Sequence, residues 1–317
     1  MMFVLALARY EVGIAAAVET YPSKLIRLVV PYPPGGGVDA VARLIAPKLS
    51  ERVGQQVVID NRGGAGGNIG TEYAARAPKD GYTLVMGAAA LAINASLYGK
   101  LPFDPVRDFT PISLLAATPN IVTVHPSLPV NSMRDLLRLA HKSPRRLNYG
   151  SAGNGTTSHL AAELLKSMAK IDIVHVPYRG TTGALVALMS GEAPLMLAPA
   201  LTVLPHINAG KLRAIAITSS VRSEVLPRLP TVSESGLPGY EASQWYGILA
   251  PAGVSPQIMS FLGPHVVETL RDPAVSNRLS QEGSIPVGGS PSEFTAHLKA
   301  EIEKWSKVVR QSGARVD

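Results

Sequence analysis

Cysteine is absent from the 317 residues, and this absence excludes disulfides, thiolate metal sites and cysteine nucleophiles together. A chain without cysteine also folds without an oxidase, which suits an exported protein. Aromatic residues are scarce at 5%, and no stretch after residue 20 has 18 or more consecutive apolar residues. The sequence therefore predicts no membrane-spanning segment beyond its first twenty residues.

Apolar residues and glycine are, in contrast, abundant. Hydrophobic residues make up 46% of the chain, and 29 glycines and 26 prolines supply many short turns. This composition is typical of a globular protein with enough apolar material for two lobes of ordinary domain size. The formal net charge is +7, but Lys and Arg are scattered along predicted helices instead of clustering with aromatic residues, so no nucleic-acid partner is expected.

Residues 1–20, MMFVLALARYEVGIAAAVET, have part of the pattern of a secretory signal. They contain an apolar stretch, and the small residues Ala15, Ala16 and Ala17 form a cleavage site. Arg9 and Glu11 interrupt the apolar stretch, and no basic residue precedes it. We therefore expect an atypical signal segment and an exported, periplasmic protein.

From Lys24 onward, strand and helix patterns alternate in two successive βαβαβ units. This order predicts an α/β protein with two lobes, each a largely parallel sheet with helices on both faces. Residues 108–129 and 245–256 are extended apolar runs that end in proline-containing turns, and they are predicted to be paired hinge strands. The tail from Ser255 is helical and is expected to pack on the first lobe. The predicted strands are 25–32, 55–61, 82–87, 147–151, 171–178 and 193–199, and the predicted helices are 38–54, 68–77, 156–169 and 182–191.

Each predicted lobe opens with a strand, a glycine-rich turn and a helix, as VVPYPPGGGVDAVARL at 29–44 and LNYGSAGNGTTSHLAAEL at 147–164. Glycine lets the backbone approach a ligand, and a helix start adds free N–H groups and about half a positive charge. Either turn alone is equally well explained as a simple connection. Their pairing across two lobes favours an anion clamp, whereas the third glycine-rich stretch, at 61–70, is interpreted as a structural turn.

A nicotinamide-dependent oxidoreductase is the alternative, because GNGTTS at 153–158 is similar to a dinucleotide-binding turn and Asp172 follows at nearly the expected distance. Two details oppose it: Ser158 replaces the third glycine, and Asp172 begins its strand instead of ending it. A hydrolase lacks support, since neither G-x-S-x-G nor S-x-x-K occurs. His159 and Glu163 lie one helical turn apart and are expected to form a helix-surface pair and not a metal site.

Several ordered segments resemble the Bug-type receptors of tripartite tricarboxylate transporters, over residues 21–313. The resemblance implies a type II periplasmic binding fold, also called a Venus flytrap, with a ligand between two lobes joined by hinge strands. The implied lobes are residues 21–122 plus 245–317 and residues 123–244. The segments that carry it are YPSKLIRLVVPYPPGGGVD, VVIDNRGGAGGNIGTE, APKDGYTLVMG, LPFDPVRDFTPIS, YGSAGNGTTSHLAAEL, VHVPYRGTTGAL, LPHINAGKLRAIAITSS and LPTVSESGLPGYEASQWYGILAPAG.

The resemblance also implies how a carboxylate would be held, mainly by backbone amides and ordered water. Tyr178 is expected to line the cleft, and Arg179 is either a cleft residue or a solvated loop charge. The remaining implied contacts are Tyr32, Pro34, Gly35, Gly36, Ala88 and Ala89 in the first lobe and Ser151, Asn154, Gly155, Thr156 and Thr157 in the second.

One position departs from the family pattern. Many relatives have an aspartate at or beside the position of Ala198, where a carboxylate faces the ligand, and this chain has none there. The departure predicts that Ala198 lines the cleft and that the ligand is a plain mono- or dicarboxylate, aliphatic or aromatic, instead of an amino acid. The resemblance further implies a monomeric receptor that is not an enzyme, needs no cofactor or metal, and works with integral-membrane transporter subunits.

Overall fold

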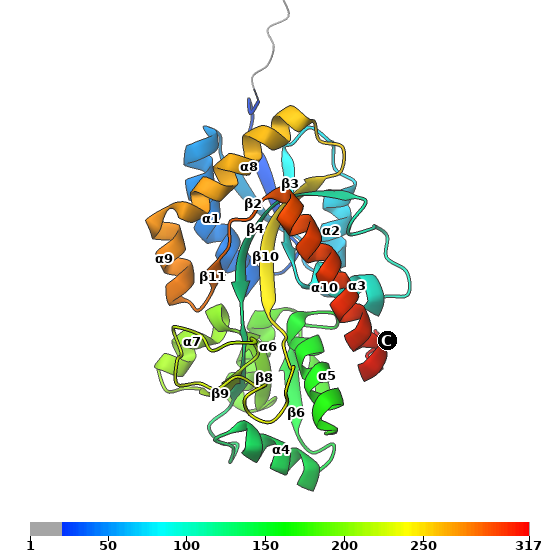
Figure 1. The fold of residues 1–317 in the computed structure, drawn as a ribbon, viewed down its shortest axis with the longest axis vertical. Helices are drawn as coiled ribbons and strands as arrows, with labels where there is room; N and C mark the ends of the chain where they lie inside the picture. The colour runs from blue at the N-terminus through cyan, green and yellow to red at the C-terminus, as the bar shows by residue number, and fades with distance from the viewer. Residues whose placement is uncertain (1–20, 317) are drawn as a thin grey trace, which may run out of the picture.

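The computed structural model describes residues 21–316, in which two β-sheets lie one above the other with helices around each (Figure 1). The signal segment expected at residues 1–20 lies outside the described residues. The upper sheet in Figure 1 has the order β11-β4-β10-β3-β1-β2. Its strands are β1 (Ile26–Val30), β2 (Val57–Asn61), β3 (Thr83–Ala88), β4 (Phe109–Thr118), β10 (Gln244–Pro251) and β11 (Ile285–Pro286).

The lower sheet has the order β7-β6-β8-β5-β9. In both sheets three neighbouring strands are parallel, namely β2-β1-β3 above and β7-β6-β8 below, and the strands beyond them are antiparallel. The two predicted α/β units are thus present. The strands of this sheet are β5 (Asn120–Val124), β6 (Asn148–Ser151), β7 (Val174–Pro177), β8 (Leu195–Pro199) and β9 (Arg213–Ile217).

Helices cover both sheets, and the first-lobe helices follow from local signals. The helix α1 (Gly37–Val53) ends at Gly54 in the left-handed conformation, which lets the chain turn back into β2. Its apolar face covers Leu28 and Val30, and Val29 on the opposite face is buried in a separate apolar cluster, so the β1 strand is buried on both sides. The other helices of this lobe are η1 (Ala65–Gly67), α2 (Asn68–Ala75), α3 (Ala90–Leu97), α8 (Pro256–Arg271), α9 (Pro273–Gln281) and α10 (Pro291–Ser312).

The last helix, α10, reaches further than the sequence analysis expected. It begins with a capping box of Ser290 and Glu293 and packs beside α3 in the first lobe, as predicted for the tail. It also contacts α5 in the second lobe, so it lies along both lobes (Figure 1). The second-lobe helices are α4 (Met133–Lys142), α5 (Thr157–Ala169), α6 (Thr181–Ser190) and α7 (Ala200–Asn208).

Two crossing segments join the lobes. Only Pro119 separates β4 of the first sheet from β5 of the second, and the chain returns through residues 218–243 to the start of β10. The Asn120 side chain donates from Nδ2 to the Ala242 carbonyl at 2.7 Å, and the Thr218 hydroxyl donates to the same carbonyl at 2.9 Å. The crossings are therefore tied to each other. Of the helices within residues 21–316, none has the length and apolar character needed to cross a bilayer.

Candidate functional site

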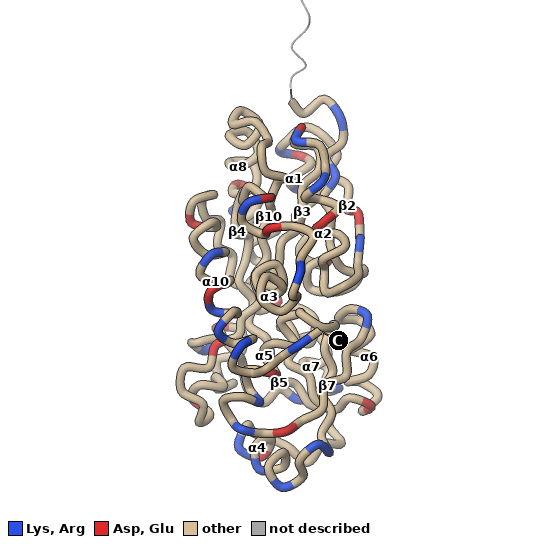
Figure 2. The backbone as a smooth tube through the Cα atoms, turned by 90° about the vertical axis from the view of Figure 1, so that its right-hand side faces the viewer, with Lys and Arg blue, Asp and Glu red and all other residues tan. Residues whose placement is uncertain are grey.

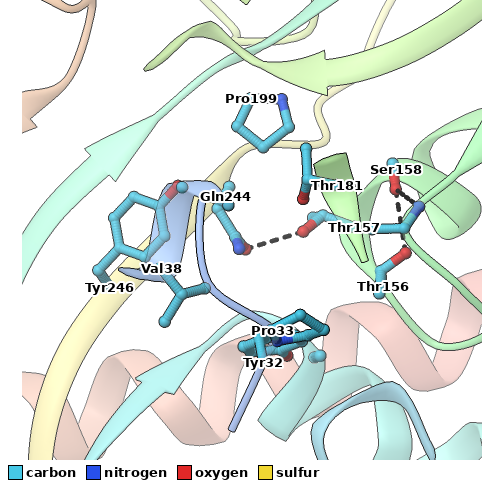
Figure 3. Close-up of a pocket in the computed structure, with 14 residues that line it drawn as sticks. Tyr32, Pro33, Val38, Thr156, Thr157, Ser158, Thr181, Pro199, Gln244 and Tyr246 are labelled. Carbon is cyan, nitrogen blue, oxygen red and sulfur yellow. Dashed lines mark hydrogen bonds between the residues drawn. The ribbon is translucent and has the colours of Figure 1, made fainter. Parts of the chain in front are cut away.

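A cavity of about 30 Å³ lies between the two lobes (Figure 3). A water molecule needs roughly 10–15 Å³ by this measure, so the space between the lobes admits more than one water-sized group. Lys and Arg are spread over both lobes (Figure 2), but no charged side chain is found among the described residues that line the cavity. Its lining consists of Tyr32, Pro33, Gly36, Gly37, Val38, Ala90, Ala152, Thr156, Thr157, Ser158, Thr181, Pro199, Gln244 and Tyr246.

The lining gathers the amino-terminal ends of five helices. The first residues of α1, α3, α5 and α6 are Gly37, Ala90, Thr157 and Thr181, and Pro199 caps the start of α7. Each helix start carries unpaired N–H groups and the positive end of the helix dipole. The sequence predicts two such ends. Five ends around one cavity make an electropositive site, with no cationic side chain among the lining residues that the structure describes.

The first glycine turn is held by a buried carboxylate. Gly35 has a φ of 85°, which favours glycine, and its N–H donates to Asp39 Oδ2 at 2.9 Å. Arg43 donates to the same oxygen at 2.8 Å, and Asn61 donates to Asp39 Oδ1 at 2.9 Å. Although burial raises the pKa of the Asp39 carboxyl, these hydrogen bonds and the Arg43 charge lower it below its ordinary value. Asp39 therefore keeps the turn in shape as an anion.

The second glycine turn is held by histidines. Gly155 has a φ of 79°, and its N–H donates to His159 Nδ1 at 3.3 Å, so this nitrogen is unprotonated. His175 shares a hydrogen bond of 2.6 Å with the Ser151 hydroxyl and stacks on His159 with ring centroids 4.2 Å apart. Burial lowers the pKa of His159 to about 4 and that of His175 to about 3, with a smaller contribution from neighbouring positive charge. Both rings are neutral near pH 7.

Gln244, the first residue of β10, connects the lobes across the cavity. Its Oε1 accepts a hydrogen bond from the Ala89 N–H of the first lobe at 3.2 Å and from the Thr157 hydroxyl of the second at 2.8 Å (Figure 3). These two donors fix the orientation of the amide, which leaves the Nε2 group as a donor beside the cavity. Sequence reasoning missed Gln244. The available signal was its polar side chain at the start of an otherwise apolar strand, QWYGILAP.

Only some of the ligand contacts that the resemblance predicts line the cavity in the structure. Four of them line the cavity: Tyr32, Gly36, Thr156 and Thr157. Others support the lining. Ala88 is buried beside it, Ala89 donates its N–H to Gln244, Ser151 contacts His175, and Gly35 and Gly155 shape the turns.

The rest of the predicted contacts lie at the edge of the site. The Pro34 carbonyl accepts a hydrogen bond from Thr182 at 3.4 Å, and the Asn154 carbonyl lies against Gly66 of the opposite lobe. The Tyr178 hydroxyl donates to Glu192 at 2.8 Å, and Arg179 is exposed. Neither Tyr178 nor Arg179 is part of the cavity lining.

Ala198 is placed differently from the expectation that it faces the cleft. Its side chain is fully buried in an apolar cluster with Ile121, Leu188 and Met196. The next residue, Pro199, lines the cavity instead. Successive side chains of a strand point to opposite faces, so an alignment error of one residue moves a position from the ligand side into the lobe core.

The expected surface pair of His159 and Glu163 is also placed differently, because both side chains are buried. Glu163 accepts hydrogen bonds from the Tyr149 hydroxyl at 2.6 Å and from Lys166 at 2.7 Å. The two residues belong to the support of the second turn. Within residues 21–316, no group of three or more His, Cys, Asp or Glu side chains is arranged to hold a metal ion.

Comparison with known proteins gives a consistent result. The model of the tripartite tricarboxylate transporter family receptor (TctC) matches residues 41–314. The protein BugT of Bordetella pertussis is 37% identical over 308 residues, which cover 96% of this chain and 94% of BugT. None of these matches supports the oxidoreductase alternative.

Solved structures show the same fold. The structure of R. palustris Rpa4515 with adipate is 40% identical, has a TM-score of 0.89, and the match covers 92% of this chain and 98% of that one. MatC from Rhodopseudomonas palustris with bound malate is 32% identical with a TM-score of 0.87, covering 91% and 100%. The expected periplasmic-binding fold with two lobes is confirmed. The family model and the similar proteins match over most of the chain, and the structure has a cavity between two lobes with helix starts around it. The chain therefore belongs to the tripartite tricarboxylate transporter receptor family.

Proposed function

We propose that this protein captures a small carboxylate between its lobes in the periplasm and presents it, as a monomer and without catalysis, to integral-membrane transporter subunits. The observation that carries the proposal is the convergence of five helix starts on a cavity whose described lining offers hydroxyl and amide donors. A charge-assisted hydrogen bond contributes about 1.5–3 kcal/mol. Three or four such bonds, less the cost of association, support roughly micromolar affinity.

The relatives support this ligand class. Rpa4515 is described with adipate and MatC with malate. Adipate and malate are both organic acids with two carboxylates. Export is supported by the family and by a structure described as the periplasmic binding protein BugD, which is 32% identical with a TM-score of 0.89.

The lining also indicates which acids are disfavoured. An ammonium group inside the cavity would need an anionic partner, and the described lining residues include no Asp or Glu. Burying an ammonium without a partner costs several kcal/mol. The prediction that amino acids bind poorly therefore stands on the whole lining instead of on Ala198.

Calorimetric titration with two acids of equal length tests the proposal. Succinate is expected to bind at least 10-fold more tightly than aspartate, which differs by one ammonium group. Adipate and malate extend the comparison, and a nicotinamide dinucleotide serves as the control for the oxidoreductase alternative. Aspartate binding as tight as succinate would contradict the ligand assignment, and binding of the dinucleotide but of no carboxylate would contradict the function.

A further inference from the structure

Tyr246 has a buried hydroxyl group without a partner. The residue lies in β10 and is 0% exposed, and its hydroxyl makes no hydrogen bond to any described residue. The Thr118 hydroxyl is near enough to lower the pKa of this phenol, but its hydrogen bond, of 2.7 Å, is with Ser284. A buried polar group left unpaired is unfavourable and rare in native structures, so this hydroxyl needs an explanation.

The hydroxyl lies at one end of the cavity. Tyr246 is part of the lining, and its oxygen is so close to Gly37 that a Cβ atom on Gly37 would lie 2.5 Å from it. It therefore reaches the start of α1, near Pro199 at the start of α7. In Figure 3 Tyr246 lies on the opposite side of the view from Thr156, Thr157 and Ser158, with Gln244 between them.

The missing partner is an acceptor. Burial raises the pKa of the Tyr246 phenol and outweighs the lowering effect of Thr118, so the hydroxyl stays protonated. Its neighbours in the lining, Gly37, Val38 and Pro199, have no side-chain oxygen, and the helix starts present N–H donors. A phenol among donors is complemented by an anionic oxygen.

We propose that Tyr246 is a specificity-determining residue that donates its hydroxyl hydrogen to the second carboxylate of the bound acid. One carboxylate is held at the α5 start by the backbone N–H groups of Thr157 and Ser158, and the other at the α1 and α7 starts by Tyr246. The receptor thereby selects short dicarboxylates over monocarboxylates of the same length. This inference rests on the proposed function, because it assigns a part of the same cavity.

The test compares succinate with butyrate on the wild type and on Tyr246→Phe, by calorimetry. Loss of a charge-assisted hydrogen bond lowers succinate affinity by roughly 10- to 100-fold, while butyrate affinity stays within about 2-fold. The melting temperature of the ligand-free variant is expected to be unchanged or higher, because the removed hydroxyl had no partner.

Tyr240→Phe is the matched control. The Tyr240 hydroxyl is equally buried but donates to the Ala161 carbonyl at 2.7 Å, and it lies outside the cavity lining. This variant is expected to melt at a lower temperature and to keep the wild-type ratio of succinate to butyrate affinity. An equal loss for both acids in Tyr246→Phe, or no loss for succinate, would overturn the inference. Failure of the wild type to bind any carboxylate would overturn the proposed function itself.

Discussion

The two glycine turns of this receptor have the same backbone plan and different chemistry. In each, a left-handed glycine donates its N–H to a side chain four residues later, inside the helix that the turn begins. In the first lobe Gly35 donates to the Asp39 carboxylate, and in the second Gly155 donates to the His159 imidazole. This backbone conformation needs a hydrogen-bond acceptor on the residue four places after the glycine. A carboxylate supplies it in the first turn and a neutral imidazole in the second.

The charge of the acceptor, anionic in Asp39 and neutral in His159, determines how each turn responds to a change in pH. Asp39 is an anion balanced by Arg43, which is itself partly exposed at the surface. His159 is neutral and enclosed, with His175 stacked on it and Lys166 nearby. Acidification adds charge to the second turn, whereas the lowered carboxyl pKa of Asp39 helps the first turn to keep its charge.

The largest effect on succinate affinity is expected from replacing the glycine of each turn by alanine. The two substitutions should differ because the two glycines lie against different side chains of the opposite lobe. A Cβ on Gly155 collides with Asn94 of the opposite lobe, whereas a Cβ on Gly35 lies 3.1 Å from Thr182 Oγ1 at the exposed edge of the cleft. Both alanine variants carry about 1–2 kcal/mol of backbone strain. Gly155→Ala is expected to weaken succinate binding more than 100-fold in calorimetry, and Gly35→Ala clearly less, because only Gly155→Ala also prevents closure.

A second substitution identifies the cause of the Gly155→Ala defect. Asn94→Ala removes the side-chain oxygen that meets the new methyl group. The double variant Asn94→Ala/Gly155→Ala is expected to recover part of the lost affinity. A double variant no better than Gly155→Ala would mean that backbone strain alone causes the defect.

Acid is expected to have an intermediate effect, to which His159 in the second lobe contributes. The unfolded chain binds a proton at His159 near pH 6.5, and the folded protein resists it until about pH 4. Because the unfolded state binds more protons in this window, the free energy of unfolding falls as pH drops from 6.5 to 4, by about 3 kcal/mol for His159. Urea unfolding at several pH values measures this slope. The carboxyl pKa of Asp39 is lowered, so its contribution persists through the window.

Two glutamine variants test which histidine causes the fall in the free energy of unfolding with pH. His159→Gln removes one titrating ring and is expected to reduce the pH dependence between 6.5 and 4, while His175, whose pKa is lowered to about 3, keeps the remainder. His141→Gln, at an exposed position of α4, is expected to leave it as in the wild type. Equal slopes in both variants would place the acid sensitivity elsewhere in the protein.

The smallest effect is expected at the hydrogen bond between the first turn and α6. Thr182 donates to the Pro34 carbonyl at 3.4 Å, a long bond at an exposed position. Thr182→Val is expected to change succinate affinity less than about 5-fold, or under about 1 kcal/mol. The adjacent variant Thr181→Val, inside the cavity lining, should cost more. The reverse order would show that closure depends on the cleft edge instead of on the cavity.

Local patterns were sufficient to predict the two α/β units and both glycine turns. A strand, a turn and a helix follow one another within some fifteen residues, so the local sequence determines their arrangement. Gln244, Thr181 and Pro199 could not be found in this way. They join the site only because α6, α7 and the second crossing segment bring distant parts of the chain to one cavity.

Ala198 shows a different limit. The strand itself was predicted, and β8 forms at Leu195–Pro199. Side chains alternate between the two faces of a strand, so a shift of one residue in the alignment with the family pattern assigns a residue to the wrong face. His159 shows a third limit, because a helical position four residues from Glu163 is equally compatible with a surface and with a buried support.

The uncharged lining of the cavity has a consequence for binding at different ionic strengths. Helix starts and hydroxyl groups act at short range on a ligand between the lobes, so salt screens these contacts little. The net charge of +7 on the whole chain acts at long range and draws anions toward the molecule. Salt therefore slows the arrival of the ligand by screening this attraction, while the short-range contacts that govern its departure change little, so the affinity falls only modestly as salt is added.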